Sequence, residues 1–192
     1  MKSRPLPVIQ TERLTLRMAR PADAPELLRF YRENEPFLAP WRPTSSPEAA
    51  KLEFWAAQIQ TWQREWELDL GLRLWLFPRA NPTPLLGHIG FTVLVRGPAQ
   101  FCYLGYHLGR DSEGHGYMYE ALDSALTYAF DAMHLHRIMA NYMPRNARSA
   151  RLLERLGFGI DGFARAYLRI AGVWEDHVMT SKTNPSWREP ER

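Results

Sequence analysis

The chain has 192 residues, of which 45% are hydrophobic, a length and composition that suit one domain with one buried core. Its single cysteine, Cys102, excludes an internal disulfide and fits a reducing compartment, and no apolar run is long enough for a membrane span or a secretory signal. We therefore expect a cytoplasmic protein with no membrane partner.

The charge of the chain is modest in total but unusual in kind. The formal net charge is +3, and only three of the 24 basic residues are lysines. The planar guanidinium of arginine binds phosphates and carboxylates through paired hydrogen bonds, so the bias indicates an anionic ligand or partner. Arginines are densest between Arg137 and Arg169. This segment is either an ordinary solvated surface or a docking face for an anionic partner.

The first third of the chain predicts a strand and two helices. Residues 11–19 alternate apolar and polar side chains, which is the period of a half-buried strand. A helix is expected from residue 21 to the proline-rich segment 34–43, where an irregular loop would begin. A Ser-Pro pair at 46–47 is typical of the start of a second helix. The core-facing stripe expected on that helix is Trp55, Ile59, Trp62 and Trp66.

The middle of the chain predicts an antiparallel meander. Strand-like runs at 70–77, 85–95 and 101–108 are separated by two short turns that contain proline or glycine. A helix is expected at 117–133 after the third strand.

The last third predicts a strand, a helix and a hairpin. A buried strand is expected at 136–143, followed by a helix that begins near Asn146 and stops before Gly157. Two closing strands would turn at residues 171–172. We expect one domain over residues 1–183 and a polar, frayed tail over residues 184–192.

Two glycines stand between the strand at 101–108 and the following helix. Gly114 and Gly116 allow a ligand to approach the backbone and adopt positive φ without steric cost. Free amides and the dipole of the helix start favour an anion such as a pyrophosphate. An ordinary turn would also use such glycines. The loop lacks the Gly-Lys-Ser/Thr ending of a P-loop and the three-glycine dinucleotide fingerprint, which excludes those two phosphate sites.

The order of these elements and two sequence blocks resemble the GCN5-related N-acetyltransferases (GNAT). "EGHGYM" (113–118) is similar to the family loop Gln/Arg-x-x-Gly-x-Gly/Ala, with Glu113 in place of a neutral or basic residue and Met118 in place of the last small one. "NARSARLLERLGF" (146–158) looks like the family's Asn-x-x-Ser helix. "GVWEDHVMT" (172–180) and other stretches are similar to the ribosomal-protein alanine N-acetyltransferase subfamily.

This resemblance implies an α/β (α+β) fold with a single acyltransferase domain. Its central sheet would be mixed and largely antiparallel, with helices on both faces and strands that splay at the cofactor site. Acetyl-coenzyme A would be the acetyl donor, without a metal, and the N-terminus of a ribosomal protein would be the acceptor. The residues that would then bind the cofactor are Tyr106, His107, Leu108, Glu113, Gly114, His115, Gly116, Tyr117, Met118, Asn146 and Ser149.

Tyr103 and Ser149 are the catalytic residues that the resemblance implies. Many relatives have Glu at the position of Tyr103 and Tyr at that of Leu153, so this chain lacks the usual base and acid. An α-amine has a pKa of about 8, so about a tenth is neutral at pH 7, and a weak base, or water held by Tyr103, would suffice to deprotonate it. The hydroxyl of Ser149 would assist the departing thiolate. The rival mechanism uses Cys102 as an acyl-carrying nucleophile.

The acceptor side is expected from the loop near Trp41 and the final hairpin. Glu33 and Glu35 would attract a positively charged N-terminus, and the apolar walls would be Phe37, Trp41, Tyr167 and Trp174. Two other functions stay open. One is acetylation of a small amine such as an antibiotic, a polyamine or an amino acid. The other is an RNA- or ribosome-binding module that uses the arginines of residues 137–169.

Overall fold

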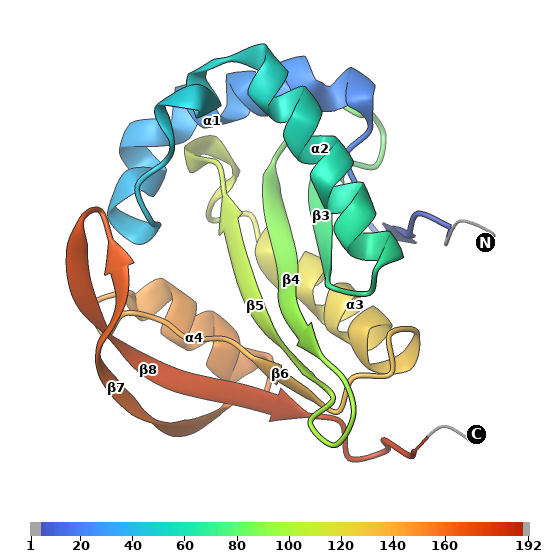
Figure 1. Cartoon of the computed structure of the whole chain (residues 1–192), viewed down its shortest axis with the longest axis vertical. Coiled ribbons are helices and arrows are strands. Elements are labelled where there is room, and N and C mark those ends of the chain that lie inside the picture. The colour runs from blue at the N-terminus through green and yellow to red at the C-terminus, as the bar shows by residue number, and fades with distance from the viewer. Residues whose placement is uncertain (1–4, 190–192) are drawn as a thin grey trace.

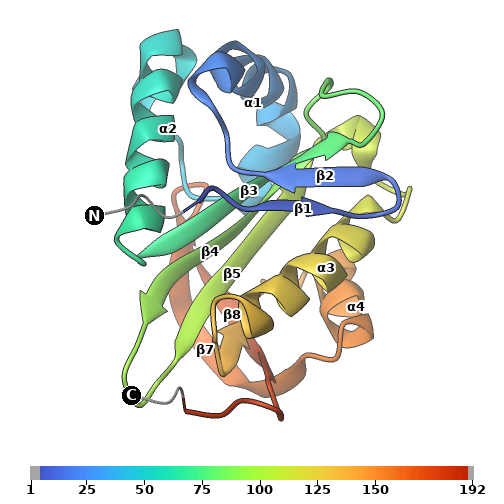
Figure 2. The same cartoon turned by 90° about the vertical axis from the view of Figure 1, so that its right-hand side faces the viewer.

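The computed structural model describes residues 5–189, which form a central eight-stranded sheet with helices on both faces (Figures 1 and 2). The strand order is β1-β2-β3-β4-β5-β6-β8-β7. All neighbours are antiparallel except β5 and β6, which run parallel. The expected mixed, largely antiparallel sheet is therefore confirmed.

The N-terminal elements are β1 (Val8–Gln10), β2 (Leu14–Arg17), α1 (Ala24–Leu38) and α2 (Leu52–Glu67). The first helix ends at Leu38, within the segment 34–43 where its end was expected, although α1 continues through Pro36. A proline in the last turn removes only one helical hydrogen bond and keeps a helical φ. The second helix begins later than expected. Ser46 instead caps a short 3-10 helix at Pro47–Ala50, accepting a hydrogen bond from Glu48 N at 3.3 Å.

The expected meander is confirmed as β3 (Gly71–Pro78), β4 (Gly87–Val95) and β5 (Phe101–Leu108). The remaining elements are α3 (Tyr117–Asp131), β6 (Arg137–Met139), α4 (Ala147–Arg155), β7 (Gly159–Ile170) and β8 (Val173–Thr183). The strand expected at 136–143 is only three residues long, because the chain leaves β5 after Met139 and its backbone stays hydrogen-bonded to β8 only at Ala140 and Tyr142.

The helices cover the sheet in two pairs (Figure 2). α1 and α2 pack on one face, where Trp55 and Ile59 of the predicted stripe meet Trp75 and Phe77 of β3. α3 packs on the other face through Ala121, Leu122 and Ala125, and α4 contributes Leu153. Alternation along β3 explains the two clusters, since successive side chains point to opposite faces. Between residues 5 and 189, no helix combines the length and apolarity needed to cross a membrane.

The sheet opens between β5 and β6. Their parallel pairing covers only three positions, Phe101 with Arg137, Cys102 with Ile138 and Tyr103 with Met139. β6 ends at Met139, the partner of Tyr103, and the chain that follows it separates from β5 (Figure 1), while β5 stays paired with β4 as far as Leu108. The splayed strands expected from the resemblance are therefore present, and the C-terminal half of β5 has one open edge.

Candidate active site

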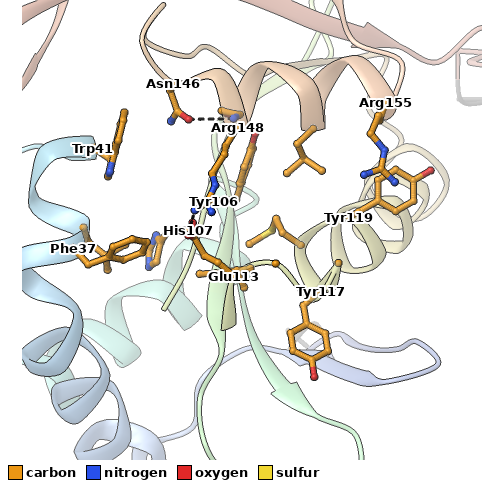
Figure 3. Close-up of a pocket in the computed structure, with 17 residues that line it drawn as sticks. Phe37, Trp41, Tyr106, His107, Glu113, Tyr117, Tyr119, Asn146, Arg148 and Arg155 are labelled. Carbon is orange, nitrogen blue, oxygen red and sulfur yellow. Dashed lines mark hydrogen bonds and ion pairs between the residues drawn. The ribbon is translucent and has the colours of Figure 1, made fainter. Parts of the chain in front are cut away.

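A first cavity of about 340 Å³ lies at this open edge, between β5, the glycine loop, α4 and the end of α1 (Figure 3). It brings together all the residues predicted to contact the cofactor except His115. Those that line it are Tyr106, His107, Leu108, Glu113, Gly114, Gly116, Tyr117, Met118, Asn146 and Ser149. The elements that carry them are far apart in sequence, so the splay of the sheet creates the cavity.

The loop presents backbone amides to this cavity. Gly114 and Gly116 have φ of +81° and +77°, and Gly116 is the N-cap of α3. The first backbone amide of α3 that donates a helical hydrogen bond is that of Glu120, and its acceptor is Gly116 O at 3.2 Å. The amides of Tyr117, Met118 and Tyr119 therefore point out of the helix end. Such a helix start suits a phosphate or pyrophosphate group.

His115 lies outside the cavity and supports the loop instead. Its ring stacks on Tyr117 with 5.5 Å between centroids, and its carbonyl accepts a hydrogen bond from Arg13 Nη1 at 2.9 Å. Arg13 also pairs with Glu120 of α3 at 2.6 Å. Arg13, which directly precedes β2, thus connects the β1–β2 turn to the glycine loop, a role that no local sequence pattern indicates.

The start of α4 brings Asn146 and Ser149 to the cavity. The side-chain oxygen of Asn146 caps the helix by accepting a hydrogen bond from Ser149 N at 3.1 Å. Only the NH₂ group of Asn146 is then left to donate to a ligand. The hydroxyl of Ser149 lies 2.6 Å from that of Tyr106, and burial raises the pKa of Tyr106 to about 12 although the Ser149 hydrogen bond lowers it. Both hydroxyls are therefore protonated at neutral pH.

Sequence reasoning missed several lining residues, which are Leu38, Tyr119, Arg148, Leu152 and Arg155. Arg148, Leu152 and Arg155 follow one another at spacings of four and three, so helical periodicity could have placed them on one face of α4. Arg148 forms an ion pair with Glu113 of the glycine loop (Figure 3). The unusual carboxylate of this loop is thus matched by a cation on the opposite wall.

A second cavity of about 430 Å³ adjoins the first. The two share six lining residues, which are Leu38, Trp41, Tyr106, His107, Asn146 and Ser149. The second cavity extends towards α1 and α2 along Gly90, Gly105 and Arg73. Burial holds the pKa of His88 well below its ordinary value and lowers that of His107 to about 3, with further lowering by Arg73 and Arg42, respectively. Both imidazoles are therefore neutral at pH 7.

The residues predicted for the acceptor side are dispersed. Trp41 lines both cavities, whereas Phe37 lines the first. Glu33 forms an ion pair with Arg29, and Glu35 with Arg42, and neither carboxylate lines these two cavities. Their positions give no support to a direct role in attracting an N-terminus.

The two hairpin residues predicted as acceptor walls lie outside both cavities. Tyr167 accepts a hydrogen bond at 3.4 Å from Asn141, a lining residue of the second cavity. Trp174 is 63% exposed on the hairpin surface. Tyr167 is therefore adjacent to the second cavity, and Trp174 stays available only for contacts at the surface.

Tyr103 and Cys102 stand at the closed end of the splay. Tyr103 is the last residue of β5 that pairs with β6, and it lines neither cavity. Cys102 has no exposed surface, and burial raises the pKa of its thiol to about 12. A buried and protonated thiol is a poor nucleophile, so the structure gives no support to the rival mechanism through Cys102.

Several arginines of residues 137–169 have partners within the fold. Arg137, Arg145 and Arg148 form ion pairs, and Arg155 lies over an aromatic ring. Their partners are, in order, Asp161, Glu175, Glu113 and Tyr119. These four arginines therefore contact the hairpin or the walls of the first cavity.

Comparison with known proteins agrees with this architecture. Residues 13–159 match the family described as Acetyltransferase (GNAT) domain. The [ribosomal protein uS5]-alanine N-acetyltransferase of Escherichia coli is 40% identical over 93% of this chain and 92% of its own. The crystal structure of the ribosomal-protein-S5-alanine acetyltransferase of Vibrio fischeri is 31% identical, with a TM-score of 0.90 over 95% of this chain and all of that one. RimJ of Mycobacterium smegmatis, solved in complex with CoA-disulfide, is 25% identical, with a TM-score of 0.83 over 94% of this chain and 86% of its own.

The open sheet edge, the glycine loop at a helix start and the Asn-capped helix are the features that the resemblance to the N-acetyltransferases implied. The match over residues 13–159 and the 40% identity to a curated relative are decisive. The chain belongs to the GNAT acetyltransferase family.

Proposed function

We propose that this protein transfers the acetyl group of acetyl-coenzyme A to the N-terminal α-amine of a protein. The acceptor that we propose is the N-terminal alanine of a small-subunit ribosomal protein, because relatives named for that activity match this chain over nearly its whole length. The observation that carries the proposal is the junction of the two cavities at Tyr106, Asn146 and Ser149. A donor in the first cavity and an acceptor in the second would meet there.

The first cavity fits the coenzyme in its chemistry. The outward amides of Tyr117 and Met118 and the two glycines offer a site for the pyrophosphate. Arg155 adds a positive charge to the cavity wall, whereas the charge of Arg148 is paired with Glu113. The open edge of β5 from Tyr106 to Leu108 offers backbone groups to the pantetheine amides. The thioester would then lie near the hydroxyl of Ser149.

Transfer would occur by direct attack in a ternary complex. The neutral amine attacks the thioester carbonyl, the N–C bond forms, and the C–S bond breaks. The nitrogen loses a proton to water, and the thiolate gains one through the hydroxyl of Ser149. A thiol of this kind has a pKa of about 8.5, so a neutral hydroxyl held by Tyr106 is an adequate source of assistance.

The test is a comparison of acceptors with one donor. Acetyl-coenzyme A is offered with peptides that start with Ala, Ser, Met or acetyl-Ala, and with free lysine and spermine, while thiol release is followed. We expect the Ala peptide to react fastest and the acetyl-Ala peptide not to react. Faster reaction with spermine or lysine would replace this proposal with a small-molecule acceptor.

A further inference from the structure

A pair of glycines on neighbouring strands lines the second cavity. Gly90 of β4 and Gly105 of β5 are direct cross-strand partners, and both belong to its wall. A Cβ atom at Gly105 would have no described atom within 4 Å outside its chain neighbours, whereas one at Gly90 would lie 3.0 Å from His88 Cε1. The open space along this wall therefore lies over Gly105. A glycine inside a strand often marks the close approach of another backbone.

Gly105 also stands beside the place where the two cavities meet. It directly precedes Tyr106, whose hydroxyl contacts Ser149 at the junction. Successive residues of a strand face opposite sides of the sheet, so the faces of Gly105 and Tyr106 are opposite. An acceptor chain that lies over Gly105 would therefore be separated from the first cavity only by the edge of β5.

The charges of the second cavity restrict what it binds. Among the described residues that line it there is no aspartate or glutamate. Arg42 and Arg73 contribute guanidinium groups, while their partners Glu35 and Glu65 lie outside the lining. The three histidines of the wall are His88, His107 and His177, and the tyrosines are Tyr31, Tyr106 and Tyr142. No carboxylate is placed to compensate an ammonium group, so an amine is favoured in its neutral form.

This charge pattern favours α-amines over lysine side chains. With pKa values of about 8 and 10.4, the neutral fraction of an α-amine at pH 7 exceeds that of lysine by about 230-fold. If the acceptor must enter as the neutral amine, an α-amine is therefore favoured over a lysine before the cavity contacts the rest of the acceptor.

We propose that the second cavity receives the first residue of the acceptor chain and that Gly105 is the specificity-determining residue that lets this residue approach the thioester. The inference rests on the proposed function and adds the place and the size limit of the acceptor. A side chain at position 105 narrows the space for the first residue. It leaves the glycine loop and α4 untouched.

The experiment uses Gly105→Ala and Gly105→Val with peptides that start with Gly, Ala or Thr. We expect unchanged affinity for acetyl-coenzyme A in calorimetry for both variants. With the Ala peptide, kcat/KM should fall about tenfold for Gly105→Ala and at least a hundredfold for Gly105→Val, since extra methyl groups in a filled site are rejected by such factors. The loss should grow from Gly to Ala to Thr.

The matched control is Gly159→Val on β7, where a Cβ also meets no described atom within 4 Å outside its chain neighbours and which lines neither cavity. It should behave like the wild type. The inference is overturned if Gly105→Val transfers acetyl groups normally, if its loss is equal for all three peptides, or if it weakens acetyl-coenzyme A binding to the same extent. If Gly105→Val does not fold, the size trend in Gly105→Ala decides.

Failure of the proposed function has a different signature. The wild-type protein would then react with none of the peptides but with a small amine such as spermine. A loss of that reaction in Gly105→Val would keep the second cavity as the acceptor site but overturn its assignment to the first residue of a chain.

Discussion

The hydrogen bond between Tyr106 and Ser149 makes Ser149→Ala a quantitative test of how the thiolate leaves. The two hydroxyl oxygens are 2.6 Å apart at the junction of the cavities. A hydrogen bond to a charged group contributes about 1.5–3 kcal/mol, which corresponds to a loss of about 10- to 150-fold in kcat. The KM for acetyl-coenzyme A should change less than about threefold, because the loop and the strand edge are unaltered.

The assay is steady-state thiol release at saturating Ala peptide, with Tyr106→Phe as the matched variant. Tyr106→Phe removes the partner hydroxyl but keeps that of Ser149, so we expect it to lower kcat less than Ser149→Ala does. An unchanged kcat with a raised KM in Ser149→Ala would refute leaving-group assistance and show a binding role only. A larger loss in Tyr106→Phe would transfer the assisting role to Tyr106.

Four other outcomes are expected. Gly116→Val should weaken acetyl-coenzyme A binding in calorimetry without unfolding the protein, because a side chain at φ of +77° strains the loop; unchanged affinity would contradict the loop assignment. Glu113→Gln should bind acetyl-coenzyme A equally or more tightly, since it removes a negative charge and frees Arg148, whereas a large loss would reveal a duty of the carboxylate. Tyr103→Phe should lower the rate of acetyl transfer about tenfold or less, and a collapse of the rate would mark Tyr103 as a base. In the wild type, the rate at subsaturating peptide should rise with pH and level off at about pH 8, the pKa of the α-amine being about 8. Because burial lowers the pKa of His107 to about 3, the unfolded state binds its proton more readily, and this residue alone should lower the free energy of unfolding by about 2 kcal/mol between neutral pH and pH 5, in addition to the loss from His88; thermal melts of His107→Gln should show a weaker acid dependence than the wild type, and an equal one would contradict this origin.

Local patterns predicted most of the fold because they report burial directly. The Trp55 and Ile59 stripe packs in the core, and the three meander strands form nearly where alternation placed them. Proline was a less reliable marker of the residue where a helix ends, since Pro36 lies within the last turn of α1. The short β1 was missed because three residues carry too little periodicity to be recognised.

The candidate site was predictable where one segment supplies the geometry. Gly116 at positive φ and Asn146 as a helix cap follow from the demands of a helix start on those residue types. Contacts between distant segments were not predictable. One example is the ion pair of Glu113 with Arg148, and another is the position of Tyr103 outside both cavities. Both depend on where the pairing of β5 with β6 ends.

The most direct test of the central claim locates the acetyl group on a product. A peptide that starts with Ala and contains an internal lysine is incubated with acetyl-coenzyme A and the protein, and fragmentation mass spectrometry assigns the modified nitrogen. We expect one acetyl group, on the α-amine of the first residue. Acetylation of the lysine to a similar extent, or no modification while spermine is acetylated, would contradict it.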